Sequence, residues 1–206
     1  MTHPDPPPAL LPPPADHLSL DFANTLFWRG ATMPQETLRT PTDLLAWLAG
    51  AGMAGTDAMQ SHWQAAPQAA ETAYRVALDL RETIYRILAE PELALDDLAV
   101  LNRALAAAPE RRRLEPTATG WAWRTEPWSA PNFHHLLAPI VWSAADLLAG
   151  PRRTRVRTCA NPQCRWLFLD DSKAGTRRWC SMSSCGNRAK AHRHYSRTRG
   201  RPANPT

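Results

Sequence analysis

The chain has only four cysteines among 206 residues, and it lacks several features that mark common classes of protein. No run of about twenty apolar residues occurs, so we expect no helix that crosses a membrane. The first residues show no basic segment followed by an apolar one, and we therefore expect no secretory signal and a cytoplasmic, reducing environment. No Ser-His-Asp order, glycine-rich phosphate loop or acidic pair stands out, so we expect no enzymatic activity.

The four cysteines stand in two pairs near the end of the chain, with four residues inside each pair and fifteen between the pairs. One reversal of the chain can bring such thiolates together, and four sulfurs in a tetrahedron leave no open position for water or substrate. We therefore predict a structural zinc ion. The alternatives are two disulfides, four buried thiols, or a site in which His192 or His194 replaces one cysteine. The predicted ligands are Cys159, Cys164, Cys180 and Cys185.

The residues around the cysteines predict how this segment folds. Residues 165–172 and 176–179 are typical of two short strands around a turn at Gly175. The residues after Cys185 are good helix formers without a breaker, so a helix should begin at or just after the fourth ligand. Its amino end would suit the negative charge of a zinc tetrathiolate. Together these elements form a small α+β finger of the treble-clef kind.

Three aromatic residues, Trp166, Phe168 and Trp179, lie in the predicted hairpin of the finger. A domain of about fifty residues needs an apolar core in addition to its metal, which favours a core role for these rings. The alternative is that one ring is exposed and stacks on a nucleic-acid base.

Three stretches of this segment carry a resemblance: Cys159-x4-Cys164-Arg-Trp-Leu-Phe-Leu-Asp-Asp-Ser, Arg177-Arg-Trp-Cys-Ser-Met182 and Cys185-Gly-Asn-Arg-Ala-Lys190. They resemble the CGNR zinc finger of bacterial proteins. In that family the finger usually follows a helical ABATE domain, and residues 20–25 and 41–48 are similar to the start of that domain. The resemblance implies a stress-linked transcription regulator.

Charge is distributed unevenly along the chain. Residues 151–206 hold fourteen Arg or Lys against two Asp, a formal balance of +12, whereas the first 150 residues hold ten basic and seventeen acidic groups. Such asymmetry suggests a polyanion partner for the basic part. Arg177 and Arg178 are candidate phosphate contacts, unless Asp170 and Asp171 neutralise them.

Residues 187–201 form a basic stripe when they are wound as a helix at about 100° per residue. Arginines on such a stripe can contact phosphates or base edges in a major groove. The alternative is a solvated helix face. Arg188 points away from the stripe and can brace the finger instead. The predicted nucleic-acid contacts are Arg188, Lys190, Arg193, Arg197 and Arg201.

The first 150 residues predict a helical domain. We expect helices over 16–28, 43–51, 68–89, from 96 or 97 onward, and 132–148, with Pro139 kinking the last or moving its start, and a hairpin of 111–117 with 121–126. The tryptophans at 121, 123 and 128 either line an effector pocket or fill the core. The sequence does not set the roles of Asp21, Asn24, Thr25 and Arg29.

The expected protein is mainly α. It has a disordered proline-rich leader (1–15), a helical domain with a small β-hairpin (16–150), the zinc finger (151–200) and a disordered tail (201–206). We expect a transcription regulator that binds DNA through the finger, while the helical domain senses a small-molecule effector or a protein partner. The alternatives are RNA binding and a protein-interaction finger that docks an acidic partner. Target sequence, regulatory sign, effector and oligomeric state do not follow from the sequence.

Overall fold

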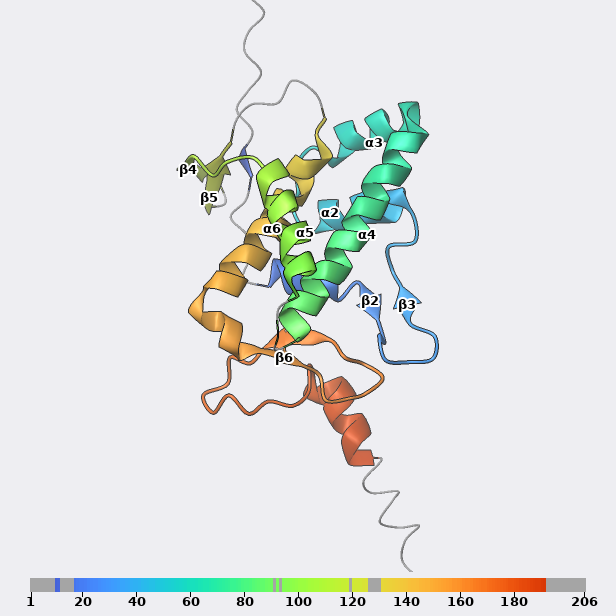
Figure 1. Ribbon diagram of the computed structural model, residues 1–206, viewed down its shortest axis with the longest axis vertical. Helices are drawn as coiled ribbons and strands as arrows, with labels where there is room; N and C mark the ends of the chain where they lie inside the picture. Colours follow the sequence, from blue (N-terminus) through green and yellow to red (C-terminus); the bar gives the residue numbers. More distant parts are fainter. Residues whose placement is uncertain are drawn as a thin grey trace, which may run out of the picture.

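Figure 1 shows the computed structural model, which describes residues 10–11, 17–90, 92, 94–118, 120–125 and 131–191. The described part is mainly helical, as predicted. The helices are α1 (Leu18–Ala23), α2 (Pro41–Gly50), α3 (Thr56–Ala65), α4 (Pro67–Ala89), α5 (Leu95–Ala107), α6 (Phe133–Ala149), the 3₁₀ helix η1 (Pro151–Arg155) and the π turn η2 (Met182–Gly186). The strands are β1 (Leu10–Leu11), β2 (Leu26–Phe27), β3 (Gln35–Glu36), β4 (Arg113–Thr117), β5 (Gly120–Arg124), β6 (Val156–Thr158) and β7 (Leu167–Leu169).

Helix α4 lies at the centre of the helical domain and contacts α1, α2, α3, α5 and α6. Its first residue is Pro67, which suits the first turn because no backbone N–H is needed there. Leu80, Ile84 and Leu88 follow at four-residue steps and are at most 2% exposed. Burying each of these side chains contributes about 1.5–3 kcal/mol, so the apolar face of α4 organises the core.

Helix boundaries follow local signals in most places. The Thr40 side chain accepts a hydrogen bond from the Asp43 N–H at 3.1 Å, and Pro41 is the first residue of α2. Helix α6 begins at Phe133 and continues through Pro139, so the proline does not move its start. The helix expected over 16–28 is shorter, because α1 ends at Ala23 and β2 follows. Helix α3 was not predicted, and its first turn has no side-chain cap.

Small antiparallel sheets flank the helices. The expected hairpin of β4 and β5 is present, and Leu10–Leu11 of the leader adds a third strand beside β5. Trp121 is 62% exposed and Trp123 packs toward Ala138 and Trp142, so these two described tryptophans do not line a common pocket. Trp128, the other residues of the leader and the tail from 201 onward lie outside the described residues. No described helix has both the length and the apolar character that a membrane crossing requires.

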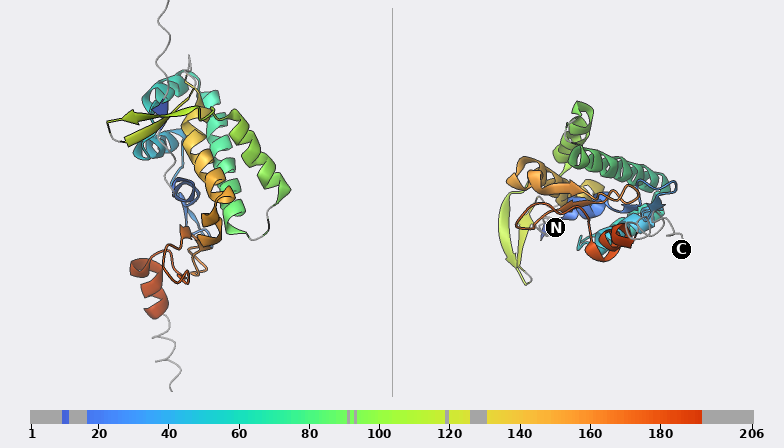
Figure 2. Two further views of the ribbon diagram at one scale, coloured as in Figure 1. Left: turned by 90° about the vertical axis from the view of Figure 1, so that its left-hand side faces the viewer. Right: turned by 90° about the horizontal axis from the view of Figure 1, so that it is seen from below.

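The finger packs against one end of the helical domain, as Figures 1 and 2 show. Strands β6 and β7 pair antiparallel and contact α4. The expected pairing was different: residues 167–169 pair with the strand before the first cysteine, and residues 176–179 form no strand. Val156, Leu167 and Leu169 join the core of the helical domain, so one continuous core underlies both parts.

Candidate metal centre and basic surface

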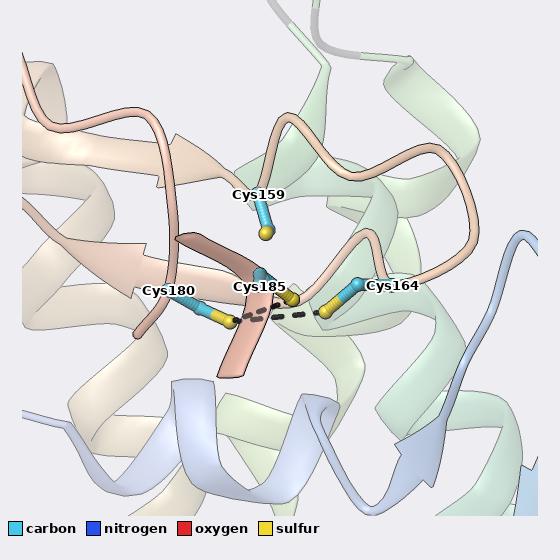
Figure 3. A group of neighbouring side chains, drawn as sticks. All are labelled: Cys159, Cys164, Cys180 and Cys185. Carbon is cyan, nitrogen blue, oxygen red and sulfur yellow. Dashed lines mark hydrogen bonds between the residues drawn. The ribbon is translucent and has the colours of Figure 1, made fainter. Parts of the chain in front are cut away.

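The four cysteines meet at one point, as Figure 3 shows. Their Sγ atoms all lie within 4.8 Å of one another, and two of the separations, Cys164 to Cys180 and Cys180 to Cys185, are 3.8 Å. A metal with bonds of about 2.3 Å to four sulfurs in a tetrahedron separates the sulfurs by about 3.8 Å. None of the four is in a disulfide, whose S–S bond would be about 2.05 Å. The sulfurs therefore fit a shared metal ion.

Different elements deliver the four thiols. Cys159 follows β6, Cys164 lies in the turn before β7, Cys180 lies in a loop, and Cys185 lies in the π turn η2. We call residues 159–164 the knuckle. Its amino end is fixed by two backbone hydrogen bonds: the Cys159 N–H donates to the Trp166 carbonyl at 2.8 Å, and the Ala160 N–H donates to the Arg178 carbonyl at 2.8 Å. The second of these bonds joins the segment before Cys180 to the first pair of cysteines.

The arrangement at Cys185 agrees with the predicted finger. The chain continues from η2 into a helical segment, residues 187–191, at the end of the described range. A helix thus begins directly after the fourth cysteine, as expected. The Asn161 side chain donates to the Cys185 sulfur at 3.4 Å, which adds a polar contact to the cluster.

Burial and hydrogen bonds shift the pKa values of Cys164, Cys180 and Cys185 when no metal is bound. Burial raises the pKa of Cys164 to about 12, and it also raises the pKa of Cys180. Burial acts the same way on Cys185, but hydrogen bonds from Asn161 and the neighbouring thiols lower the pKa of Cys185. Because a metal needs thiolates, binding must displace protons from this site, and a divalent cation supplies the compensating charge.

The aromatic residues of the finger form its small core, as predicted. Phe168 is buried with the cysteines, and Trp28, Trp166 and Trp179 pack against them. Trp28 comes from the helical domain, a contribution that the sequence did not indicate. The core of the finger is therefore completed by a residue more than a hundred positions earlier in the chain.

The Asn24 side chain joins the helical domain to the finger. Its amide donates to the Leu167 carbonyl at 2.9 Å and accepts from the Leu167 N–H at 3.0 Å. Asn24 is 7% exposed, so this pair of bonds is shielded from water. In addition, the Tyr85 hydroxyl donates to the Arg165 carbonyl at 2.9 Å. Asn24 is thus a structural residue that holds strand β7.

Gly30 lies directly against the knuckle. Its N–H donates to the Gln163 carbonyl at 3.1 Å, and a Cβ at position 30 would lie 1.8 Å from the Pro162 carbonyl oxygen. Only glycine allows this approach of two backbones. The helical domain therefore holds the segment between the first two cysteines.

Two arginines with buried side chains, paired with half-buried glutamates, stabilise the same region. Arg29 pairs with Glu82 at 2.6 Å and lies 3.9 Å from the centre of the Tyr85 ring. Arg81, 3% exposed, pairs with Glu36 through two bonds of 2.7 Å. Burial alone would raise the pKa of Glu82, but the hydrogen bonds and charges of Arg29 and Arg81 lower the pKa of this carboxyl. These contacts show that Arg29 has a structural role.

Thr25 and Asp21 are the other two residues whose roles the sequence left open. The Thr25 hydroxyl donates to the Phe22 carbonyl at 2.7 Å and accepts from Arg81 at 3.3 Å, so Thr25 closes the end of α1. Asp21 is exposed on α1, and burial of part of its carboxyl raises the pKa of Asp21.

Asp170 and Arg177 organise the turn between the two cysteine pairs. The buried Asp170 carboxylate accepts from the Ser172 N–H at 3.1 Å, the Ser172 hydroxyl at 2.5 Å and the Arg177 N–H at 2.8 Å. The hydrogen bond from the Ser172 hydroxyl is the main cause of the lowered pKa of Asp170. The Arg177 guanidinium donates to the carbonyls of Trp179 and Cys180 and lies over the Phe168 ring. The Arg177 side chain therefore stabilises the turn.

The remaining cations of the finger divide into two groups. Arg152 pairs with Asp171 at 2.7 Å, while Arg153 and Arg155 donate to backbone carbonyls. Arg178, Arg188 and Lys190 are all exposed, and no carboxylate among the described residues pairs with them.

The predicted nucleic-acid contacts are only partly within the described residues. Arg188 and Lys190 lie on the helical segment 187–191. The Arg188 guanidinium lies 4.5 Å from the centre of the Trp28 ring, which agrees with the expectation that it braces the finger. Arg193, Arg197, Arg201, and the alternative ligands His192 and His194, lie outside the described residues.

Comparison with protein families gives two matches in chain order. Residues 16–151 match the ABATE family, described as "putative stress-induced transcription regulator". Residues 155–198 match the CGNR zinc finger. No curated protein matches the chain. The second match covers all four clustered cysteines, and the first covers Asn24, which holds β7, and Gly30, which lies against the knuckle.

Proposed function

Because the chain belongs to the ABATE family and carries a CGNR zinc finger, we propose that it is a cytoplasmic transcription regulator that binds DNA through this finger. In this proposal Cys159, Cys164, Cys180 and Cys185 hold one structural zinc ion, and the protein has no catalytic role. The chemistry of the donors supports zinc: four sulfurs at tetrahedral spacing form a closed site. The zinc ion would cross-link the finger.

The observation that carries the proposal is the position of free cations on the finger. The cysteine cluster and the packing of Trp28 hold the start of the last helix in place, and Arg188, Lys190 and Arg178 are exposed there without a carboxylate partner in the described range. Arginine and lysine contacts to phosphates dominate nucleic-acid affinity. The other predicted contacts, Arg193, Arg197 and Arg201, follow Lys190 in the sequence and lie outside the described residues.

Zinc content is tested first. Elemental analysis of the purified protein should find one zinc per chain, and thiol titration should find four thiols that become reactive when a chelator is added. Oxidised cysteine pairs without metal would reject the zinc site.

DNA binding is tested by fluorescence anisotropy with the zinc-loaded full chain and a labelled duplex at about 50 mM salt, a condition that favours phosphate contacts. The logarithm of the binding constant should fall linearly with the logarithm of the salt concentration. The double variant Lys190→Ala/Arg197→Ala should reduce this slope by the amount that corresponds to about two phosphate contacts. The control is Arg75→Gln, an exposed arginine in the first half of α4, which should leave the slope unchanged. Absence of binding would reject the proposal. Stronger binding to RNA than to DNA of the same sequence would favour the RNA alternative.

We assign the helical domain the role of sensing a small effector. A cavity of about 280 Å³ between α4, α5 and α6 supports this assignment, because pockets between helices commonly hold small ligands. Its apolar lining includes Leu80, Leu137 and Val141, and its polar lining is Asp79, Arg103 and His134. Thermal-shift screening should find compounds that stabilise the wild type and not a variant in which Ala104→Phe fills the cavity. Equal stabilisation of both proteins would contradict the assignment.

A further inference from the structure

The finger has a second concave feature beside the cysteine cluster. A cleft of about 730 Å³ opens between the knuckle and the start of the last helix. Asn161 and Gln163 line it from the knuckle, Arg178 and Trp179 from the segment before Cys180, and Arg188 from the helix. This volume lies within the range of about 300–1,000 Å³ that is typical of small-molecule sites, so the cleft is large enough for one nucleotide.

The cleft combines cations with an aromatic ring. Arg178 and Arg188 are exposed, and no carboxylate among the described residues pairs with either. The Arg178 guanidinium lies 5.5 Å from the centre of the half-buried Trp179 ring. Proteins that bind single-stranded nucleic acid combine a basic groove with aromatic rings on which bases stack, and arginine adds a cation–π contribution.

Two amides on the knuckle differ in what they can offer a ligand. The Asn161 amide is already used, since its Nδ2 donates to the Cys185 sulfur and its Oδ1 accepts from the Gln163 N–H at 3.1 Å. The Gln163 residue is exposed and lines the cleft. Its side chain carries both a donor and an acceptor, which is the combination that reads the edge of a base.

We propose that this cleft binds one unpaired nucleotide of a DNA strand, with its phosphate between Arg178 and Arg188, its base against Trp179 and the base edge facing Gln163. In a regular duplex the bases are stacked inside and cannot enter a cleft, whereas an unpaired base can. The inference rests on DNA binding by the finger and adds a preference for DNA that contains an unpaired nucleotide.

The test compares three DNA molecules: a blunt duplex, the same duplex with one unpaired nucleotide at an end, and that duplex with the extra nucleotide made abasic. The zinc-loaded full chain is titrated with each by anisotropy at one salt concentration. Stacking of one base should make the unpaired nucleotide increase affinity roughly tenfold over the blunt duplex. The abasic molecule should lose most of this increase, because it retains the phosphate and lacks the base.

Two variants test whether the increase in affinity for the unpaired nucleotide comes from the cleft. In Gln163→Ala and in Trp179→Leu the affinity ratio between the unpaired and abasic molecules should fall toward one. Zinc content is measured for each, and Gln163→Ala keeps the test valid where loss of Trp179 unfolds the finger. Arg75→Gln, far from the cleft on α4, should keep both the ratio and the affinity of the wild type.

The outcomes separate the two proposals. Equal binding of all three DNA molecules would overturn the cleft proposal and leave DNA binding by the finger intact. An increase that survives in Gln163→Ala and in a zinc-loaded Trp179→Leu would also overturn it. Failure to bind any of the three would reject DNA binding, and the cleft proposal with it.

Discussion

At the scale of single residues, buried polar side chains hold the finger to the helical domain. Asn24 satisfies both backbone groups of Leu167 across 143 positions of sequence. A buried polar group that loses its partner costs about 1–3 kcal/mol. Asn24 is therefore more important for stability than an exposed asparagine would be.

We predict that Asn24→Ala lowers the free energy of unfolding by about 2–5 kcal/mol, because two buried backbone groups lose their partner. Denaturant unfolding of the zinc-loaded protein measures the change. Asn102→Ala removes the same side chain from an exposed position on α5 and should have an effect within about 0.5 kcal/mol. Similar losses in the two variants would show that the bonds to Leu167 contribute little.

The ion pair of Glu82 predicts a pH dependence. Arg29 and Arg81 lower the pKa of Glu82 below its usual value of 4.5, so the folded state prefers the charged carboxylate. The resulting stabilisation is present above about pH 4.5 and is lost as the pH falls through the lower folded pKa. In Glu82→Gln, the midpoint of thermal unfolding should therefore be lower than in the wild type at pH 7, and this difference should shrink as the pH approaches 3.

The control for this prediction is Glu71→Gln. Glu71 pairs with Arg75 on the exposed face of α4, where an ion pair contributes about 0–1 kcal/mol. Its unfolding midpoint should stay close to that of the wild type throughout. A Glu82→Gln difference that is constant between pH 7 and pH 3 would contradict the assigned role of the ion pair.

At the scale of elements, the knuckle depends on the loop that contains Gly30. The two backbones touch without a side chain between them. Adding a methyl group there must move the Pro162 carbonyl, which lies between two of the metal ligands. Overpacking of this kind costs about 1–3 kcal/mol.

Gly30→Ala should accordingly weaken zinc binding and destabilise the protein. Competition with a zinc-binding chromophore measures the affinity. Gly50→Ala is the matched control, since a Cβ at the end of α2 would meet nothing within 4 Å, and this variant should be neutral or slightly more stable. Unchanged zinc affinity in Gly30→Ala would mean that the loop merely covers the knuckle.

At the scale of the whole molecule, the finger and the helical domain share a core. Val156, Leu167 and Leu169 of the finger are buried together with residues of α1, α4 and α6. Because the cysteine cluster fixes the ends of β6 and β7, loss of the metal should loosen part of this core.

Removal of zinc by a chelator should therefore lower the unfolding midpoint of the entire chain in one cooperative transition. Far-UV circular dichroism reports the helices, and the reactivity of the four cysteine thiols reports the finger. The Cys164→Ser variant, already deprived of one ligand, should respond less to the chelator. If the helices melted at the same temperature with and without metal, the two parts would be energetically independent.

The local features of this chain were predictable. Thr40 and Pro41 start α2, and the four cysteines meet, because caps and metal-ligand spacing depend on neighbours in the sequence. The pairing of β7 was predicted wrongly, since the turn at Gly175 suggested a hairpin that the structure does not form. The sequence also could not show which of Arg177 and Arg178 is used within the finger, because this depends on which carbonyls lie near each guanidinium in the fold.

The amino-acid sequence by itself determined the mainly helical class, the uneven charge and the four-cysteine finger, because these follow from composition and short-range spacing. Only the tertiary structure decided that Trp28 completes the core of the finger, that Asn24 holds β7, that Gly30 lies against the knuckle, and that Arg178 and Arg188 line one cleft. These contacts join residues far apart in the chain, and their partners are set by how the elements pack against one another.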